Sequence, residues 1–133
     1  MESEVIGFEP PTLLLDRLVD QYGIDEPEAR RKFQETKKFL LLCVSHPEAT
    51  FAPSTEIDAC WHEFLLFSRS YADFCELAGA FVHHEPSTQK DPTAYARTLT
   101  GMKKKYGDLD PEIWYESADG SDKCCSTCGS SAH

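Results

Sequence analysis

The sequence predicts an all-α protein, a single-domain bundle of about four helices that ends in a flexible, cysteine-containing tail. Apolar residues recur three and four positions apart along several segments, which places them on one helix face. Proline and glycine residues separate these segments where helices would start and end. The polar and apolar alternation typical of strands does not occur. With 133 residues, the chain can bury a core of its own.

The first two predicted helices precede Pro47. The first opens at Pro10-Pro11-Thr12, has a leucine-rich face and ends at Gly23. The second begins after Asp25, whose side chain can accept a hydrogen bond from the first turn. Its last part, residues 39–44, is apolar on every side, so we expect this helix to be central.

The third predicted helix covers about residues 56–77 as one continuous segment. Ser54 and Thr55 can cap its start, and Gly79 is a suitable end. The fourth covers about residues 92–106. After it, a short turn is expected to lay Trp114 on the bundle. One face of the third helix is marked by residues that recur three and four positions apart, namely Ile57, Trp61, Phe64, Leu65, Ser68, Tyr71, Ala72 and Cys75.

The composition changes near residue 116, after which Ser, Gly and Asp dominate. We therefore expect a helical domain over residues 1–116 and a flexible tail over residues 117–133. The tail carries Cys124, Cys125 and Cys128.

The charge of the chain excludes some classes of partner. The 13 Lys and Arg residues against 23 Asp and Glu residues give a formal net charge of −10. Nucleic acids and anionic membrane surfaces need a basic footprint, so neither is expected as a partner. No apolar run is long enough to span a membrane, and the N-terminal residues are acidic where a signal peptide would be basic. We therefore expect a cytoplasmic protein.

Asp58 and His62 are the first candidate site residues, because they lie four positions apart on one helix face. A carboxylate at that spacing can hold an imidazole in one tautomer, as a catalytic base or a metal ligand requires. The same pair can also be a structural hydrogen bond. Arg69, two turns beyond His62, would extend the pair to an anion-binding stripe, or it is an ordinary solvated residue. With Tyr71, these residues are the candidates for catalysis.

Histidines form the second candidate set, because imidazole is a common ligand of zinc and other transition metals. His62 and either His83 or His84 could share one metal ion. If the third helix is continuous, its end lies about 24 Å from His62. The chain from there to His83 or His84 spans at most about 17–20 Å, so a shared site needs a nearly straight return or a break in the helix. The alternative is that both histidines belong to a polar turn.

The cysteines divide into two groups. Cys43, Cys60 and Cys75 lie within helical patterns, and core packing is expected for Cys43 and Cys75. The tail cysteines Cys124, Cys125 and Cys128 include a Cys-x-x-Cys spacing that suits metal binding or thiol–disulfide chemistry. The tail could capture a metal ion, exchange disulfides or be an inert terminus.

The spaced set Asp58-x-x-Trp61-His62, Tyr71, Cys75, Gly79 and His83-His84 resembles the core motif of the glycine-rich domain-containing protein-like family, a domain of unknown function found in plants and bacteria. The resemblance is most specific over residues 56–86. The chain has only 7 glycines and no long glycine-rich region, so it looks more like the short stand-alone bacterial members. The resemblance implies a helical domain and no particular reaction.

Three functions stay open. The first is a small soluble binding or adaptor protein with a protein partner, with a metal held by histidines and the cysteine-rich tail. The second is an enzyme with an Asp58–His62 site, in which His62 would open into a pocket with Asp58 behind it. The third is a thiol redox or metal-transfer role of the C-terminal cysteines. An adaptor is expected to keep His62 packed and to expose an apolar patch.

Overall fold

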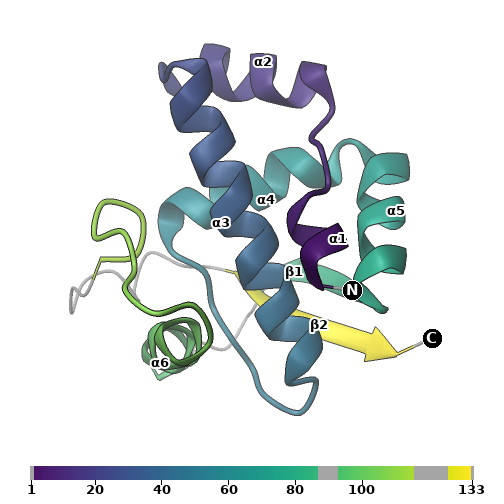
Figure 1. Ribbon diagram of the computed structural model, residues 1–133, viewed down its shortest axis with the longest axis vertical. Helices are drawn as coiled ribbons and strands as arrows, with labels where there is room; N and C mark the ends of the chain where they lie inside the picture. Colours follow the sequence, from purple (N-terminus) through teal and green to yellow (C-terminus); the bar gives the residue numbers. More distant parts are fainter. Residues whose placement is uncertain (1, 87–92, 116–125, 133) are drawn as a thin grey trace.

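The computed structural model describes residues 2–86, 93–115 and 126–132, and in these residues the fold is mostly helical, as predicted (Figure 1). Within these ranges, six helices surround one core, and two strands form a small antiparallel sheet beside them. The helices are α1 Glu2–Ile6, α2 Thr12–Tyr22, α3 Glu26–Ser45, α4 Thr55–Leu65, α5 Ser68–Ala78 and α6 Ala94–Tyr106. None of the described helices combines the length and the apolar composition that crossing a bilayer requires.

The long helix α3 lies at the centre, and each of the helices α1, α2, α4 and α6 packs against it (Figure 1). Its start is fixed by Asp25, whose carboxylate accepts a hydrogen bond of 3.0 Å from the backbone N–H of Glu28. Its last turns are buried on every side, since each residue from 39 to 43 is at most 4% exposed. The prediction of a central second helix is therefore confirmed.

The segment predicted as a single third helix is two helices. The helix α4 ends at Leu65, and α5 begins at Ser68. The backbone N–H of Phe67 bonds to the carbonyl of Phe64 at 3.0 Å, which tightens the last turn, and Phe67 then leaves the helical region with φ −96° and ψ 66°. The break lets both apolar faces reach one core, because the Phe64 ring meets the Tyr71 ring edge to face across it, with ring centres 5.0 Å apart.

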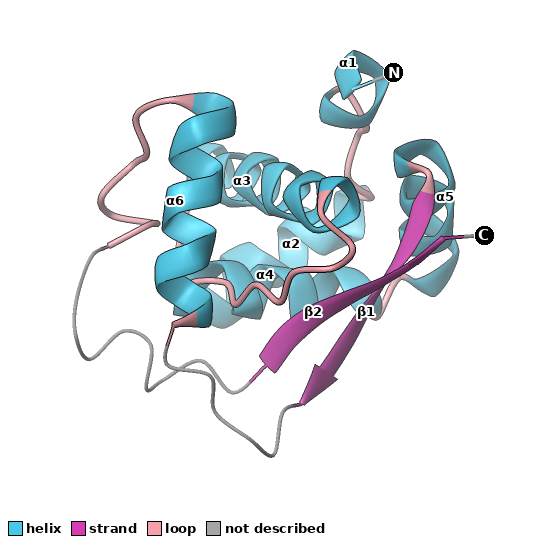
Figure 2. Ribbon diagram, turned by 90° about the horizontal axis from the view of Figure 1, so that it is seen from below, coloured by secondary structure: helices cyan, strands magenta, loops and turns pink. Residues whose placement is uncertain are grey.

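The two strands were not predicted. The strand β1, Ala80–Pro86, follows Gly79, which ends α5 with φ 99°. It pairs antiparallel with β2, Ser126–Ala132, in a register that runs from Ala80 opposite Ala132 to Pro86 opposite Ser126. Figure 2 shows the pair along one side of the helices, with α5 beside the start of β1. The tail predicted as flexible, residues 117–133, lies outside the described residues except for β2.

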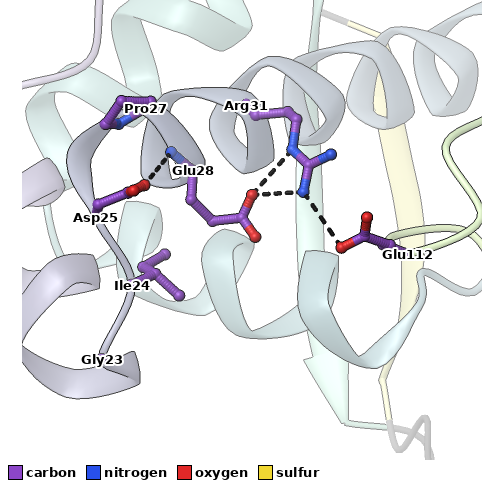
Figure 3. A pocket seen from close by; sticks show the side chains of 7 residues that line it. All are labelled: Gly23, Ile24, Asp25, Pro27, Glu28, Arg31 and Glu112. Carbon is purple, nitrogen blue, oxygen red and sulfur yellow. Dashed lines mark hydrogen bonds and ion pairs between the residues drawn. The ribbon is translucent and has the colours of Figure 1, made fainter.

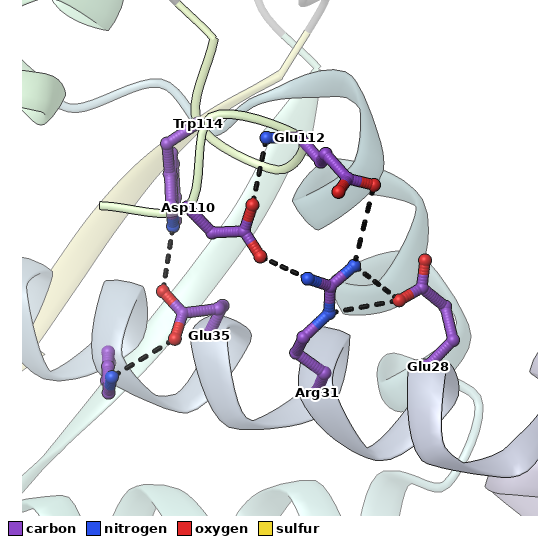
Figure 4. Close-up of polar contacts among 7 residues, drawn as sticks. Glu28, Arg31, Glu35, Asp110, Glu112 and Trp114 are labelled. Carbon is purple, nitrogen blue, oxygen red and sulfur yellow. Dashed lines mark hydrogen bonds and ion pairs between the residues drawn. The ribbon is translucent and has the colours of Figure 1, made fainter. Parts of the chain in front are cut away.

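A polar cluster joins the segment after α6 to α3 (Figure 4). Arg31 donates a hydrogen bond of 2.9 Å to Glu28 and another to Asp110. Trp114 is buried, and its indole N–H donates to Glu35 at 2.9 Å. The expectation that Trp114 lies on the bundle is therefore confirmed.

Candidate functional site

The break between α4 and α5 brings three of the predicted site residues together. Asp58 and His62 lie on α4, and the chain returns through α5 so that β1 places His84 beside them. The Nε2 atom of His84 lies 3.0 Å from Oδ1 of Asp58. The ring centres of His62 and His84 are 5.1 Å apart. A break in the helix was one of the two conditions under which the histidines could meet, and it is the one that the structure fulfils.

Burial differs among the three residues. The side chain of His84 is only 3% exposed, and its ring lies 4.1 Å from the ring centre of Trp61. The side chain of Asp58 is 20% exposed. His62 is exposed, so the packed His62 expected of an adaptor is not found. The buried imidazole is thus fixed by a carboxylate and an aromatic ring, and the exposed imidazole forms the solvent side of the cluster.

A chain of hydrogen bonds holds β1 against the two helices. The indole N–H of Trp61 donates to the hydroxyl of Tyr71 at 3.0 Å, and that hydroxyl donates to the backbone carbonyl of Val82. All three residues are buried. Burial is the main cause that raises the pKa of Tyr71 above its usual value, so its hydroxyl stays protonated. Tyr71 is therefore a positioning residue, because it holds the strand two positions before His84.

The other predicted site residues lie elsewhere. Arg69 is exposed on α5, after the break, so it does not share one continuous helix with Asp58 and His62. His83 contacts Phe81, with ring centres 4.8 Å apart. Successive side chains of a strand point to opposite faces, so β1 presents His84 and not His83 to Asp58.

The described residues contain no group of three or more His, Cys, Asp or Glu side chains arranged to hold a metal ion. His62, His84 and Asp58 bring two imidazoles and one carboxylate together without forming such a group. Cys124 and Cys125 lie outside the described residues. The backbone of Cys128 lies opposite that of His84 in the sheet.

The helical cysteines are all buried, and the expected core packing of Cys43 and Cys75 is confirmed. Cys60 and Cys75 are free thiols, and burial raises the pKa of both. Cys43 is disulfide-bonded. Its apolar surroundings in the sequence gave no signal of this bond, because buried free and oxidised cysteines occupy similar positions.

The buried Cys60 makes stability depend on pH above about 9. Burial raises the pKa of this thiol from 9.0 to about 12. The unfolded thiol ionises first, so the unfolded state holds fewer protons and stability falls as pH rises. At pH 11 this residue is expected to lower the free energy of unfolding by about 2–3 kcal/mol. Urea unfolding of the wild type and Cys60→Ala at pH 8 to 11 measures the effect.

Other groups titrate in the same range. Tyr71 and Cys75 act in the same direction as Cys60, whereas burial lowers the pKa of Lys37 to about 8 and acts in the opposite direction. The informative quantity is therefore the difference between the wild-type and Cys60→Ala curves, which should shrink by about 2–3 kcal/mol from pH 8 to pH 11. A constant difference would contradict the prediction.

A hollow at the start of α3 is lined by charged residues that already have partners (Figure 3). It is lined by the turn between α2 and α3, by the first turns of α3 and by Glu112. Asp25 caps α3, and Glu28 binds Arg31. These contacts stabilise the helix start and hold the segment after α6, so the hollow is a weaker candidate than the Asp58–His84 cluster.

Sequence reasoning missed the contact of Trp61 with His84. The adjacent Trp61-His62 pair gave a partial signal, because a buried tryptophan next to a candidate histidine can also pack against the ring of a second histidine. Its partner could not be identified without the course of β1.

Comparison with known protein families gives a match over most of the chain. A family model, UCP032817-like, matches residues 2–108, which include all three clustered residues and end before the C-terminal cysteines. Neither a curated protein nor a solved structure matches the chain. Because the model covers most of the chain, the protein belongs to the UCP032817-like family.

Proposed function

We propose that this protein is a small metal-associated binding protein, in which His62 and His84 hold one zinc or other transition-metal ion and Asp58 positions His84. The observation that carries the proposal is the contact of 3.0 Å between Asp58 and the Nε2 atom of His84, beside a second imidazole. Metal-bound histidines commonly donate their other ring N–H to a carboxylate, which fixes the tautomer.

The spacing of the rings supports the proposal. With Nε2–H donated to Asp58, the Nδ1 atom of His84 keeps its lone pair. Two imidazoles on one tetrahedral zinc ion, with Zn–N bonds of about 2.0–2.1 Å, have ring centres about 5 Å apart. The rings of His62 and His84 are 5.1 Å apart and inclined by 84°. The two rings therefore need little rearrangement to share a metal.

Two imidazoles leave coordination positions for other donors. A partner protein can supply them, and so can the C-terminal cysteines Cys124, Cys125 and Cys128, of which Cys128 has its backbone opposite that of His84. A bound metal would supply an electrophilic centre that attracts such donor groups. This favours a binding or adaptor role with a protein partner.

The enzyme alternative has less support. Its four candidates were Asp58, His62, Arg69 and Tyr71. Asp58 contacts His84, and the hydroxyl of Tyr71 is buried and already hydrogen-bonded to Trp61 and to Val82.

We also propose that the protein is related to the glycine-rich domain-containing protein-like family and that it is cytoplasmic.

Titration with zinc tests the proposed site. Calorimetry at pH 7.5 on reduced protein should show one zinc ion bound, and His84→Ala and His62→Ala should each abolish this binding. Asp58→Asn should weaken it about 10–100-fold, because the orienting acceptor is lost. His46→Ala is the matched control, since His46 is exposed beside Glu48 in another part of the fold.

Each result decides between a site and a purely structural cluster. Equal zinc affinity in the wild type, His62→Ala and His84→Ala would contradict the proposal. Loss of binding only after removal of residues 117–133 would place the metal on the tail cysteines and not on the histidines.

A second candidate function is thiol–disulfide chemistry of the C-terminal cysteines, and the disulfide at Cys43 favours it. Cys60 and Cys75 are free, so we propose that Cys43 is joined to Cys124, Cys125 or Cys128. Non-reducing peptide mapping should find a peptide that contains Cys43 linked to a C-terminal one. Recovery of Cys43 only as a free thiol from protein purified without reductant would contradict it.

A further inference from the structure

A second cavity, of about 170 Å³, lies among α2, α3 and α4 and has an apolar lining with two opposite charges. We call it the α2–α4 pocket. Leu18, Ile24 and Ala59 supply apolar surface, and Lys32 and Glu56 supply the charges. An apolar cavity of about 150 Å³ holds a molecule the size of benzene, so the pocket has room for a branched aliphatic side chain.

The acid in this pocket lacks a partner. The Oε1 atom of Glu56 is buried, and among the described side chains it is the one such atom without a hydrogen bond. A buried carboxylate oxygen without a donor is unfavourable, because it has lost its water contacts. Glu56 is one of the residues that line the pocket, so a ligand N–H that reached this oxygen would supply the missing hydrogen bond.

The base in the pocket is also available. The ammonium group of Lys32 makes no ion pair with any residue of the described parts of the chain, Glu56 included. The neighbouring thiol of Cys60 is neutral, because burial raises its pKa to about 12. One positive and one negative group thus line the same small apolar space without neutralising each other.

We propose that the α2–α4 pocket binds a free apolar amino acid of the size of leucine. The ligand ammonium would donate to Glu56, its carboxylate would accept from Lys32, and its side chain would fill the apolar space beside Leu18, Ile24 and Ala59. A zwitterion fits because it matches both charges, whereas a ligand with one charge leaves a side chain of the pocket unmatched. The proposal is independent of the metal site.

Ligand analogues test the proposal on the wild-type protein. L-leucine should shift the amide resonances of α2 and α4 residues in two-dimensional NMR spectra, with saturation in the millimolar range or below. Leucinamide lacks the carboxylate and 4-methylpentanoate lacks the amine, so each should bind at least 10-fold more weakly. Leucinamide also mimics the N-terminal residue of a peptide, so equal binding of leucinamide would overturn the assignment to a free amino acid.

Variants test the assignment of the two charges. Glu56→Gln and Lys32→Met should each lower leucine affinity at least 10-fold, and Ala59→Phe should abolish binding by filling the cavity. Glu48→Gln and Lys104→Met change exposed charges elsewhere and should bind leucine like the wild type. No shift at 10 mM leucine, or unchanged affinity in both pocket variants, would refute the proposal.

Discussion

Replacing Phe64 with alanine is expected to lower the free energy of unfolding by about 3–5 kcal/mol. The Phe64 ring is completely buried and lies within 5.0–6.2 Å of the rings of Phe8, Phe33, Tyr71 and Phe74. Alanine would leave a cavity where four segments meet, and the neighbouring rings can fill it only in part. Urea unfolding followed by tryptophan fluorescence measures the loss.

The matched control for this prediction is two residues away. Leu66 lies between α4 and α5 with 60% of its surface exposed, and Leu66→Ala should change stability by less than about 0.5 kcal/mol. If Phe64→Ala and Leu66→Ala proved equally mild, the central role of Phe64 in joining α4 to α5 would be wrong.

Tyr71→Phe is expected to lower the free energy of unfolding by about 2–4 kcal/mol, although it removes a single oxygen atom. The hydroxyl is the acceptor for the indole N–H of Trp61 and the donor to the carbonyl of Val82. Both groups would stay buried without a partner, and each such group costs about 1–3 kcal/mol. Chemical denaturation at pH 7 gives the value.

A second measurement separates this effect from a general loss of stability. Amide exchange in β1 should accelerate in Tyr71→Phe more than exchange in α2, because the lost bond anchors the strand at Val82. Tyr22→Phe is the control, because Tyr22 is 44% exposed, and it should have almost no effect. Uniform acceleration across the chain would argue against Tyr71 as the anchor of β1.

The helices were predictable where a local signal marks their ends. The carboxylate of Asp25 caps α3, the hydroxyl of Ser54 caps α4, and Gly23 ends α2 with φ 63°. These are interactions within one turn, so a few neighbouring residues determine them. The break after Leu65 was missed because Phe64 and Tyr71 keep the spacing of a continuous helix across it.

The residues of the site could be predicted from the sequence, but which of them contact each other could not. The spacing of Asp58 and His62 indicated a contact between these two, yet Asp58 contacts His84, 26 positions along the chain. That contact depends on the break and on a strand that lacks a clear alternating pattern. Its pairing strand, β2, lies far along the chain, and such long-range pairing leaves little trace in local sequence.

The position of α5 between the two parts of the site has a consequence for how this domain can change in evolution. Since α5 separates α4 from β1, its number of residues sets the register of His84 against Asp58. One residue added to or removed from α5 would rotate β1 by about 100° around the helix axis, and a full turn would displace the strand by about 5.4 Å. The exposed positions of α5, such as Ala72, Asp73 and Glu76, meet no such restriction. Related chains can therefore vary the surface of this helix freely, whereas insertions and deletions within it should be rare.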